Sequence, residues 1–282
     1  MQQIKDLVAT AISEQLFTKI QKGIAIKGLS SVKLYVSTQG DDNNDGTEAK
    51  PFKTIHKALL TAFEKYHNAS DVKHINIMFL TDMTDNSNIL IDNKLLGAKL
   101  WFNANNHNVV LNTVHVRGTS VEFKGCTFKP QELGAELSAI TITQKAFCTL
   151  RDCTFLQSNQ AFNQYIICTD FSYVIIQGES NINVGATQLN SSFISAFNKS
   201  TISLSNGSLN LKSNMTAPYF FIISRQSECY WHLTATTKAN TFTVNGKKYL
   251  VNLQSNLNTI GRGEDLLLGN QTGVIEKDGK VY

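Results

Sequence analysis

The sequence has few charged residues and no long apolar run. Charged side chains make up 17% of the 282 residues, below the usual level of about a quarter, so much of the surface polarity is expected from Asn, Ser and Thr. The formal net charge of +4 is small for this length, so no nucleic-acid partner is expected. No segment reaches about eighteen uninterrupted apolar residues, so no membrane insertion is expected. The hydrophobic content of 42% is nevertheless that of a folded protein.

The sequence also lacks a secretory signal pattern and cysteine motifs. The segment MQQIKDLVATAISEQL carries acidic residues and has no apolar stretch followed by a small-residue cleavage site. An odd number of cysteines cannot all pair, and none lies in a CxxC or zinc-ligand spacing. The five cysteines are Cys126, Cys148, Cys153, Cys168 and Cys229. We expect buried free thiols in a reducing cytosol.

Residues 1–31 form the first expected region, and residues 1–22 are predicted to be an amphipathic helix. Its apolar residues recur at spacings of three and four, which places them on one face. They are Ile4, Leu7, Val8, Ala11, Ile12, Leu16 and Ile20. A lone helix of this length is marginal in water, so the stripe needs a partner surface. Docking on its own domain and self-association or attachment to another protein remain alternative interpretations.

Residues 32–70 form a second region with a different pattern. Val32, Leu34 and Val36 alternate as in a β-strand, and a polar turn follows at residues 40–46. A helix is predicted at about residues 52–66, with Thr54 as its N-cap or Pro51 in its first turn. This helix could cover the open end of a stack of strands.

Residues 71–235 contain an internal repeat. The segment Val121-Glu-Phe-Lys-Gly-Cys-Thr-Phe128 aligns with Cys148-Thr-Leu-Arg-Asp-Cys-Thr-Phe155, at an offset of 27 residues. Further copies begin at Val174, Ile202 and Cys229, so successive starts differ by 27, 26, 28 and 27 residues. A second short strand and a polar corner precede each copy, as in Val114-His-Val116 before Val121.

A repeat that cannot bury its own apolar face must stack on copies of itself. The fold class is therefore predicted to be all-β, as a right-handed parallel β-helix with Val121 and Phe123 pointing inward. A tandem β-sandwich is the competing fold. It would need antiparallel hairpins with tight turns, and the repeat has a constant period without hairpin signals. Residues 236–282 are predicted to be an aperiodic C-terminal β element, with a hairpin at 241–251 that turns at Asn245-Gly246.

The segment Leu34-Tyr-Val-Ser-Thr-Gln-Gly40-Asp-Asp-Asn-Asn-Asp45-Gly46, followed by Pro51-Phe-Lys-Thr-Ile-His-Lys-Ala58, resembles the start of pectate-lyase-like β-helices. It is most similar to the version found in bacteriophage tail fibres and tailspikes. The resemblance covers about 30 residues, and secreted bacterial β-helix enzymes also carry the pattern. It implies a virion protein of the tail that is assembled in the host cytoplasm, usually as a homotrimer. We expect the N-terminal helix to trimerise the chain or attach it to other tail or baseplate proteins.

One candidate metal site lies in the polar turn. Asp41, Asn43 and Asp45 match the first half of a calcium-loop pattern, but Phe52 stands where the bidentate Glu should be. The alternative is a turn held by bonds from its own side chains to its backbone. No metal or other cofactor is expected.

The catalytic candidates are Asp152, Asp170 and Glu228. A glycosidase needs two carboxylates about 5–9.5 Å apart, and no two acids of the repeat occupy equivalent positions in adjacent coils. Enzymatic activity is therefore not expected, although a polysaccharide depolymerase on the same fold remains the alternative function.

Aromatic residues in and beside the coils are the candidates for glycan binding, because sugar rings stack on flat apolar surfaces. They are Trp101, Tyr173, Tyr219, Tyr230 and Trp231. Together with the resemblance, they predict a tail fibre or tailspike subunit that binds a bacterial surface polysaccharide.

Overall fold

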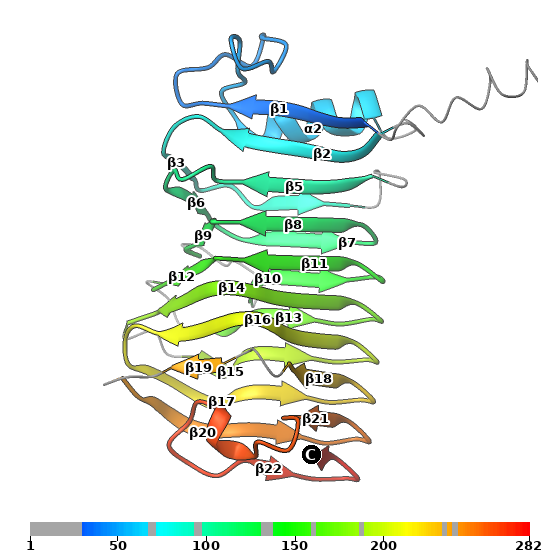
Figure 1. Ribbon diagram of the computed structural model, residues 1–282, viewed down its shortest axis with the longest axis vertical. Helices are drawn as coiled ribbons and strands as arrows, with labels where there is room; N and C mark the ends of the chain where they lie inside the picture. The colour runs from blue at the N-terminus through cyan, green and yellow to red at the C-terminus, as the bar shows by residue number, and fades with distance from the viewer. Residues whose placement is uncertain are drawn as a thin grey trace, which may run out of the picture.

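The chain forms a right-handed parallel β-solenoid of about seven turns (Figure 1). The computed structural model describes residues 30–66, 72–92, 98–130, 138–158, 162–185, 189–232, 236–238 and 242–282. Equivalent strands of successive coils pair in parallel and in register. The predicted fold class is thereby confirmed. The helix predicted at residues 1–22 lies outside the described residues.

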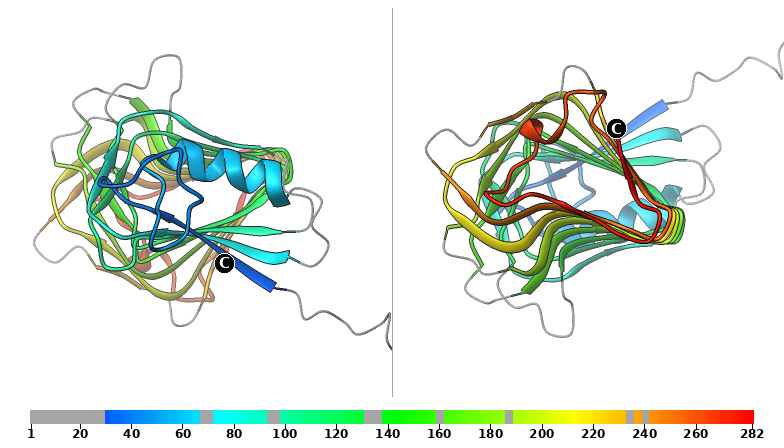
Figure 2. Two further views of the ribbon diagram at one scale, coloured as in Figure 1. Left: turned by 90° about the horizontal axis from the view of Figure 1, so that it is seen from above. Right: turned by 90° about the horizontal axis from the view of Figure 1, so that it is seen from below.

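Each coil contributes to three faces, which enclose one elongated core (Figure 2). Face 1 consists of β1 (Ser30–Val36), β2 (Val72–Phe79), β5 (Lys99–Asn103), β8 (Ser120–Lys124), β11 (Phe147–Arg151), the first parts of β14 (Tyr173–Asn183) and β16 (Thr201–Leu211), β18 (Glu228–Trp231), β21 (Asn256–Asn258) and β23 (Lys280–Val281). Face 2 consists of β3 (Met83–Asp85), β6 (Val109–Leu111), β9 (Thr127–Phe128), β12 (Thr154–Leu156), the later parts of β14 and β16, and β19 (Thr236–Lys238). Face 3 consists of β4 (Ile89–Ile91), β7 (Val114–Arg117), β10 (Ser138–Thr143), β13 (Phe162–Cys168), β15 (Leu189–Ala196), β17 (Met215–Ile223), β20 (Val244–Val251) and β22 (Val274–Ile275).

Helix α2 (Ile55–Tyr66) lies across the N-terminal end of the solenoid (Figure 2). The Thr54 hydroxyl accepts a hydrogen bond from the Lys57 backbone N–H at 3.1 Å, so Thr54 is the N-cap. Ile55, Ala58 and Ala62 are buried on the side that faces the core. The helix therefore covers the first coil, as the sequence predicts. Within the described ranges, no helix is both long and apolar enough to cross a membrane.

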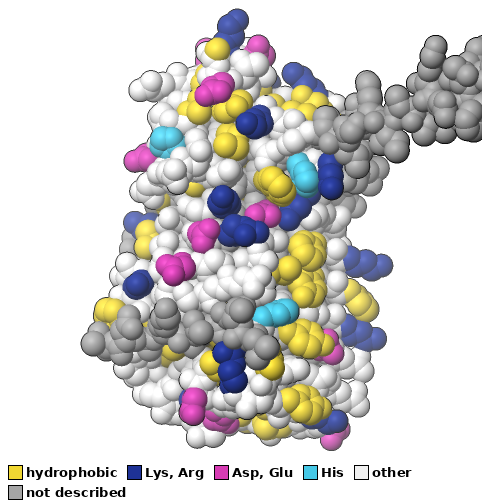
Figure 3. Space-filling view, viewed as in Figure 1, with side chains coloured by type: hydrophobic (Ala, Val, Ile, Leu, Met, Phe, Trp, Pro, Cys, Tyr) yellow, Lys and Arg dark blue, Asp and Glu magenta, His cyan; other side chains and the backbone are white. Residues whose placement is uncertain are grey.

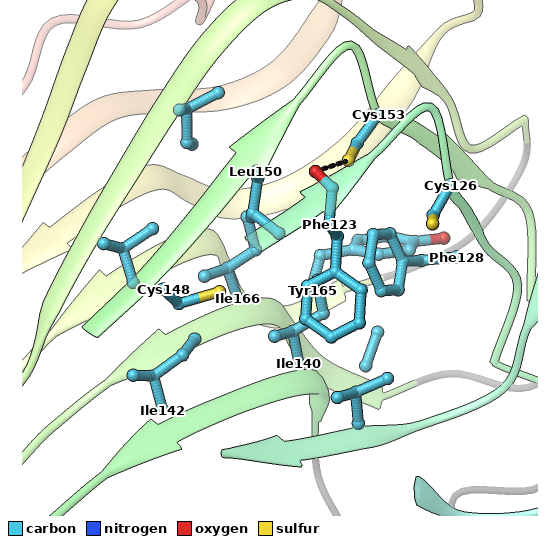
Figure 4. Close-up of a cluster of buried hydrophobic side chains, with 14 of the residues drawn as sticks. Phe123, Cys126, Phe128, Ile140, Ile142, Cys148, Leu150, Cys153, Tyr165 and Ile166 are labelled. Atoms are coloured by element: carbon cyan, nitrogen blue, oxygen red, sulfur yellow. Dashed lines mark hydrogen bonds between the residues drawn. The ribbon is translucent and has the colours of Figure 1, made fainter. Parts of the chain in front are cut away.

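The core is built from columns of inward side chains. Val121 and Phe123 are fully buried, as predicted, and Phe123 stacks on Phe102 of the preceding coil with ring centroids 4.8 Å apart. Figure 4 shows side chains from neighbouring coils converging on Phe123. Because the coils stack at about 4.8 Å, equivalent rings meet at contact distance along the axis.

All five cysteines are free and buried, which confirms the predicted state of these thiols. Burial raises the pKa of Cys126 and that of Cys168 to about 12. The Cys153 thiol donates to the Phe123 carbonyl, 3.5 Å away, inside the same cluster (Figure 4). These residues therefore act as small apolar side chains of the core.

A column of buried serines runs along the corner between face 3 and face 1. Its members are Ser172, Ser200, Ser227 and Ser255, each 2% exposed or less. Each hydroxyl accepts a hydrogen bond from the backbone N–H of the equivalent residue one coil earlier, at 3.1 to 3.2 Å. The column satisfies backbone donors that the corner would otherwise leave buried without a partner.

The C-terminal region continues the solenoid, so the predicted aperiodic element is wrong. The strand β20 runs without a turn through Asn245 and Gly246 and pairs in parallel with β17 on one side and β22 on the other. The strands β21 and β23 extend face 1 in the same way. The predicted hairpin is wrong because Gly246 permits a close approach between strands: a Cβ there would lie 1.7 Å from the Ala217 carbonyl oxygen.

Replacing a member of the serine column should destabilise the fold. In the Ser200→Ala variant, the buried N–H of Ser172 loses its acceptor, and we expect the free energy of unfolding to fall by about 1–3 kcal/mol. Urea unfolding followed by tryptophan fluorescence measures the change. Ser191→Ala, at a partly exposed position of β15, is the matched control and should change it by less than about 0.5 kcal/mol. Equal stability of both variants would contradict the role of the column.

Candidate binding face

The outer surface of face 1 carries most of the predicted aromatic candidates. Strand alternation turns every second residue of β5 and β8 outward. Register then places Trp101 beside Glu122, and Glu122 beside Thr149 of the next coil. Figure 3 shows apolar side chains gathered in a band on this side of the molecule, with basic and histidine side chains beside it. The parallel ladder thus brings residues far apart in the sequence onto one surface.

The N-terminal part of this surface is a stacked pair of rings. His74 and Trp101 lie with centroids 4.3 Å apart at an interplanar angle of 29°. Burial, with the charges of Lys73 and Lys99, lowers the pKa of His74, so its imidazole is neutral at pH 7. The indole N–H of Trp101 is buried and has no hydrogen-bond partner among the described residues. The pair is therefore an uncharged aromatic stack on the outer side of face 1.

A three-residue charge cluster adjoins the rings. The Glu122 carboxylate accepts from Lys99 Nζ at 2.9 Å and from Arg151 Nε at 3.0 Å. Burial alone would raise the pKa of Glu122, but the hydrogen bonds and charges of Lys99 and Arg151 outweigh it and hold the pKa below its ordinary value. Glu122 is therefore a carboxylate at neutral pH that holds both cations at the surface.

A second aromatic pair lies in the middle of face 1. Phe147 and Tyr173 occupy equivalent positions in β11 and β14, and their rings stack at 5.3 Å with an interplanar angle of 5°. The Lys99 ammonium lies 5.9 Å from the Phe147 ring and 5.7 Å from the Trp101 ring. Lys99 thus joins the two aromatic pairs by cation–π contacts.

The C-terminal part of the surface centres on Tyr230, which is 38% exposed. Its hydroxyl donates to Glu228 Oε2 at 2.6 Å, and this bond, with burial, raises the pKa of Tyr230 to about 12. Ser203 and His232 lie beside it, with their Oγ and Nε2 atoms 2.9 Å apart. We define the binding face as the outer surface of face 1 from Trp101 to Tyr230.

The structure places two of the aromatic candidates elsewhere. Trp231 is fully buried and contacts Phe221 edge to face at 5.7 Å, so its prediction as a glycan contact is wrong. The reason is strand alternation, because Tyr230 points outward and its neighbour must point inward. Tyr219 lies on face 3 and lines a cavity of about 480 Å³, with Lys247 Nζ 5.6 Å from its ring.

The three catalytic candidates do not form a pair. Asp152 lies at the bend between faces 1 and 2, and its Oδ1 accepts from the Glu179 backbone N–H at 2.9 Å. Asp170 lies at the opposite corner of the coil, where hydrogen bonds from Asn198 and Thr143 lower its pKa. Glu228 lies two coils further on, about 10 Å along the axis, and accepts from Tyr230. A glycosidase needs two carboxyls that face each other across the scissile bond, an arrangement that these three do not make.

The candidate calcium turn is held by its own side chains. Asp41 Oδ1 accepts from the backbone and side-chain N–H groups of Asn43 at 2.9 and 3.0 Å. Asp45 Oδ1 accepts from the backbone N–H and the hydroxyl of Thr47. Among the described residues, no three or more His, Cys, Asp or Glu side chains lie close enough together to hold a metal ion. The geometry is that of the alternative interpretation, an Asx turn.

Sequence reasoning missed the roles of Lys99, Phe147 and Arg151. Each lies at an outward position of face 1, and the strand register sets Lys99 and Arg151 one coil to either side of Glu122. The offset from β8 to β11 is 27 residues, which matches the repeat, but the offset from β5 to β8 is only 21 residues, so the period alone does not place Lys99 beside Glu122.

Comparisons with protein-family models, with curated proteins and with solved structures find no match to this chain.

The charge cluster generates a prediction about acid stability. Replacing Glu122 with Gln leaves Lys99 and Arg151 without a carboxylate, and the free energy of unfolding at pH 7 should fall by about 1 kcal/mol. A lowered folded-state pKa stabilises the fold above the unfolded pKa of about 4.3, and this contribution is lost as the pH falls through the folded value. The difference between wild type and variant should therefore shrink below about pH 4.

Urea unfolding at several pH values measures this difference. Glu179→Gln, at an exposed position, is the control and should have no comparable effect. A Glu122→Gln deficit that stays constant down to pH 3 would show that the ion pairs are not its source.

Proposed function

We propose that this protein is a bacteriophage tail fibre or tailspike subunit that adheres to a bacterial surface glycan through the binding face. The observation that carries the proposal is the recurrence of outward aromatic side chains on one rigid sheet: Trp101, Tyr173 and Tyr230. The resemblance of residues 34–58 to phage β-helix proteins supports the biological setting.

The chemistry of the binding face suits a carbohydrate. From the strand order, the three aromatic residues lie about 14 and about 10 Å apart along the axis, a spacing that follows an extended chain of sugar rings. Partly exposed amide and hydroxyl side chains, such as Gln177, Thr201 and Ser205, lie in the outward rows between or beside them and can bond sugar hydroxyls. The β-ladder fixes their positions before binding, which reduces the entropy lost on association.

Adhesion without chemistry fits the arrangement better than depolymerisation. Glu122, the carboxylate on the binding face closest to Trp101, accepts from two cations and has a lowered pKa, which suits a structural anion and not a general acid. In this proposal the bound glycan is held and not cleaved.

Truncation of the aromatic side chains should weaken glycan binding. On the polysaccharide that binds best in a panel of bacterial capsules and O-antigens, Trp101→Ala, Tyr173→Ala and Tyr230→Ala should each lower affinity roughly tenfold by biolayer interferometry. Tyr219→Ala, on face 3, is the matched control and should bind as the wild type does.

Incubation of the same polysaccharides with the wild-type protein should release no new reducing ends or unsaturated uronates. Release of such ends would favour the depolymerase instead. A panel without binding, or binding lost only in Tyr219→Ala, would contradict the proposed face.

We further propose that the protein is a homotrimer joined to the virion tail through its N-terminal segment, with the apolar stripe of residues 1–22 as the contact. Sedimentation of the full chain at micromolar concentration should give about three times the 31.3 kDa chain mass. Charged substitutions in the stripe, such as Leu7→Glu with Ile12→Glu, should convert it to a monomer, and Lys5→Glu is the control. A monomeric wild-type protein would contradict the trimer.

A further inference from the structure

The corner between face 3 and face 1 has the same backbone form in six successive coils. Each coil turns there through two consecutive residues with positive φ values, between 47° and 64°. The pairs are Gln144-Lys145, Asp170-Phe171, Asn198-Lys199, Arg225-Gln226, Leu253-Gln254 and Lys277-Asp278. The second residue of each pair donates its backbone N–H to the carbonyl oxygen of the first residue of the pair in the next coil. Lys199, for example, donates to the Arg225 carbonyl oxygen at 3.0 Å.

None of these twelve positions is a glycine, although glycine is the residue that adopts positive φ without strain. Other residues pay roughly 1 kcal/mol or more for that conformation. The chain therefore keeps side chains at this corner against a conformational cost. Strain that persists at successive coils is a reason to look for what the side chains do there.

Nine of the ten residues of the last five pairs, all but Asp170, line a groove with a volume of about 510 Å³. Phe171 and Leu253 are 58% and 37% exposed and give it apolar surface. The cations Lys199, Arg225 and Lys277 line it as well. Because the five pairs belong to successive coils, the groove extends about 19 Å along the axis.

The groove carries an excess of positive charge. Its lining holds the three cations against a single carboxylate, Asp278. Across the described ranges, neither Lys199 nor Lys277 forms an ion pair, and the Lys199 ammonium lies 5.6 Å from the Phe171 ring. Both ammonium groups therefore keep their hydrogen-bond donors for a ligand.

The neutral side chain of Asn198 links Arg225 to Asp170 by hydrogen bonds. Its Nη1 donates to Asn198 Oδ1 at 3.4 Å, and Asn198 Nδ2 donates to Asp170 Oδ1 at 2.9 Å. The Asp170 carboxylate also accepts from Thr143 at 2.7 Å. The acid is thus occupied by neutral donors and does not pair with the guanidinium, which can form a bidentate contact with another carboxylate.

We infer that this groove binds the carboxylate-bearing sugars of an acidic polysaccharide. Cations from three of the five coils match a ligand whose charges recur along its length, and the exposed apolar side chains of the other two coils match the C–H faces of sugar rings. Charge complementarity with a linear polyanion favours this occupant, while the small overall charge of +4 disfavours a nucleic acid. The inference rests on the proposed glycan binding and adds the ligand class and a second contact surface.

The test uses the full chain and four acidic polymers: polygalacturonate, alginate, hyaluronate and polysialic acid. Each is compared by biolayer interferometry with a carboxyl-reduced preparation of the same polymer. At least one acidic polymer should bind about tenfold more tightly than its reduced form, and binding should weaken as salt rises. Lys199→Gln, Arg225→Gln and Lys277→Gln should each weaken it about threefold to tenfold.

Two further variants separate binding from folding. Asp278→Asn removes the only carboxylate of the lining and should strengthen binding, which a folding defect cannot imitate. Lys212→Gln removes an exposed cation at the start of the connection from face 2 to face 3 and should leave binding unchanged. A triple variant of the three cations that binds like the wild type, or acidic polymers that bind no better than reduced ones, would overturn the inference.

The outcomes also distinguish the two proposals. If neutral glycans bind through Trp101, Tyr173 and Tyr230, and acidic glycans bind no more tightly than neutral ones, the inference about the groove fails while the proposed binding face stands. Acidic polymers that bind through the corner, with no effect of the aromatic substitutions, would support the groove and contradict the binding face. If Arg225→Gln instead dissociates an oligomer in sedimentation, the groove is a contact between subunits and the inference fails.

Discussion

Parallel hydrogen bonding between successive coils determines how this protein is built. It sets neighbouring coils about 4.8 Å apart and fixes their register, so residues about 27 positions apart in the sequence become neighbours in space. Inward neighbours form the aromatic columns of the core, and the corner neighbours include the buried serines. The outward neighbours make surfaces: aromatic rings and a charge cluster on face 1, and cations along the corner. Stability and surface chemistry thus follow from one repeated ladder.

The features that obey this period could be predicted from the sequence. Val121 and Phe123 were expected inside because their equivalents recur as apolar residues, and both are fully buried. The cysteines were expected among them and are buried too. The helix over the first coil was predicted from Thr54 and the apolar residues after it, because N-capping and helical periodicity are local signals. The candidates Trp101, Tyr173 and Tyr230 lie at outward positions of face 1, and all three are at least partly exposed.

The remaining features depend on information that is not local. Face 2 was not predicted, because several of its strands have only two or three residues, too few to show alternation. The Asn245-Gly246 pair is a strong hairpin signal, yet pairing with β17 and β22 overrides it. Trp231 follows the inward Cys229 by two residues in the same strand. Because side chains alternate along a strand, this spacing itself indicates that Trp231 points inward, against its prediction as a glycan contact. Partners such as Lys99 and Arg151 around Glu122 become visible only once the register is known.

We propose that the ladder assembles a glycan-binding surface on face 1 and its adjoining corner. A crystal or cryo-EM structure of the full protein with an oligosaccharide of its best-binding polymer tests this claim most directly. We expect sugar rings packed on Trp101, Tyr173 and Tyr230, with any carboxylate directed toward the corner cations. Sugar density confined to face 3 or to an end of the solenoid, with face 1 bare, would contradict it.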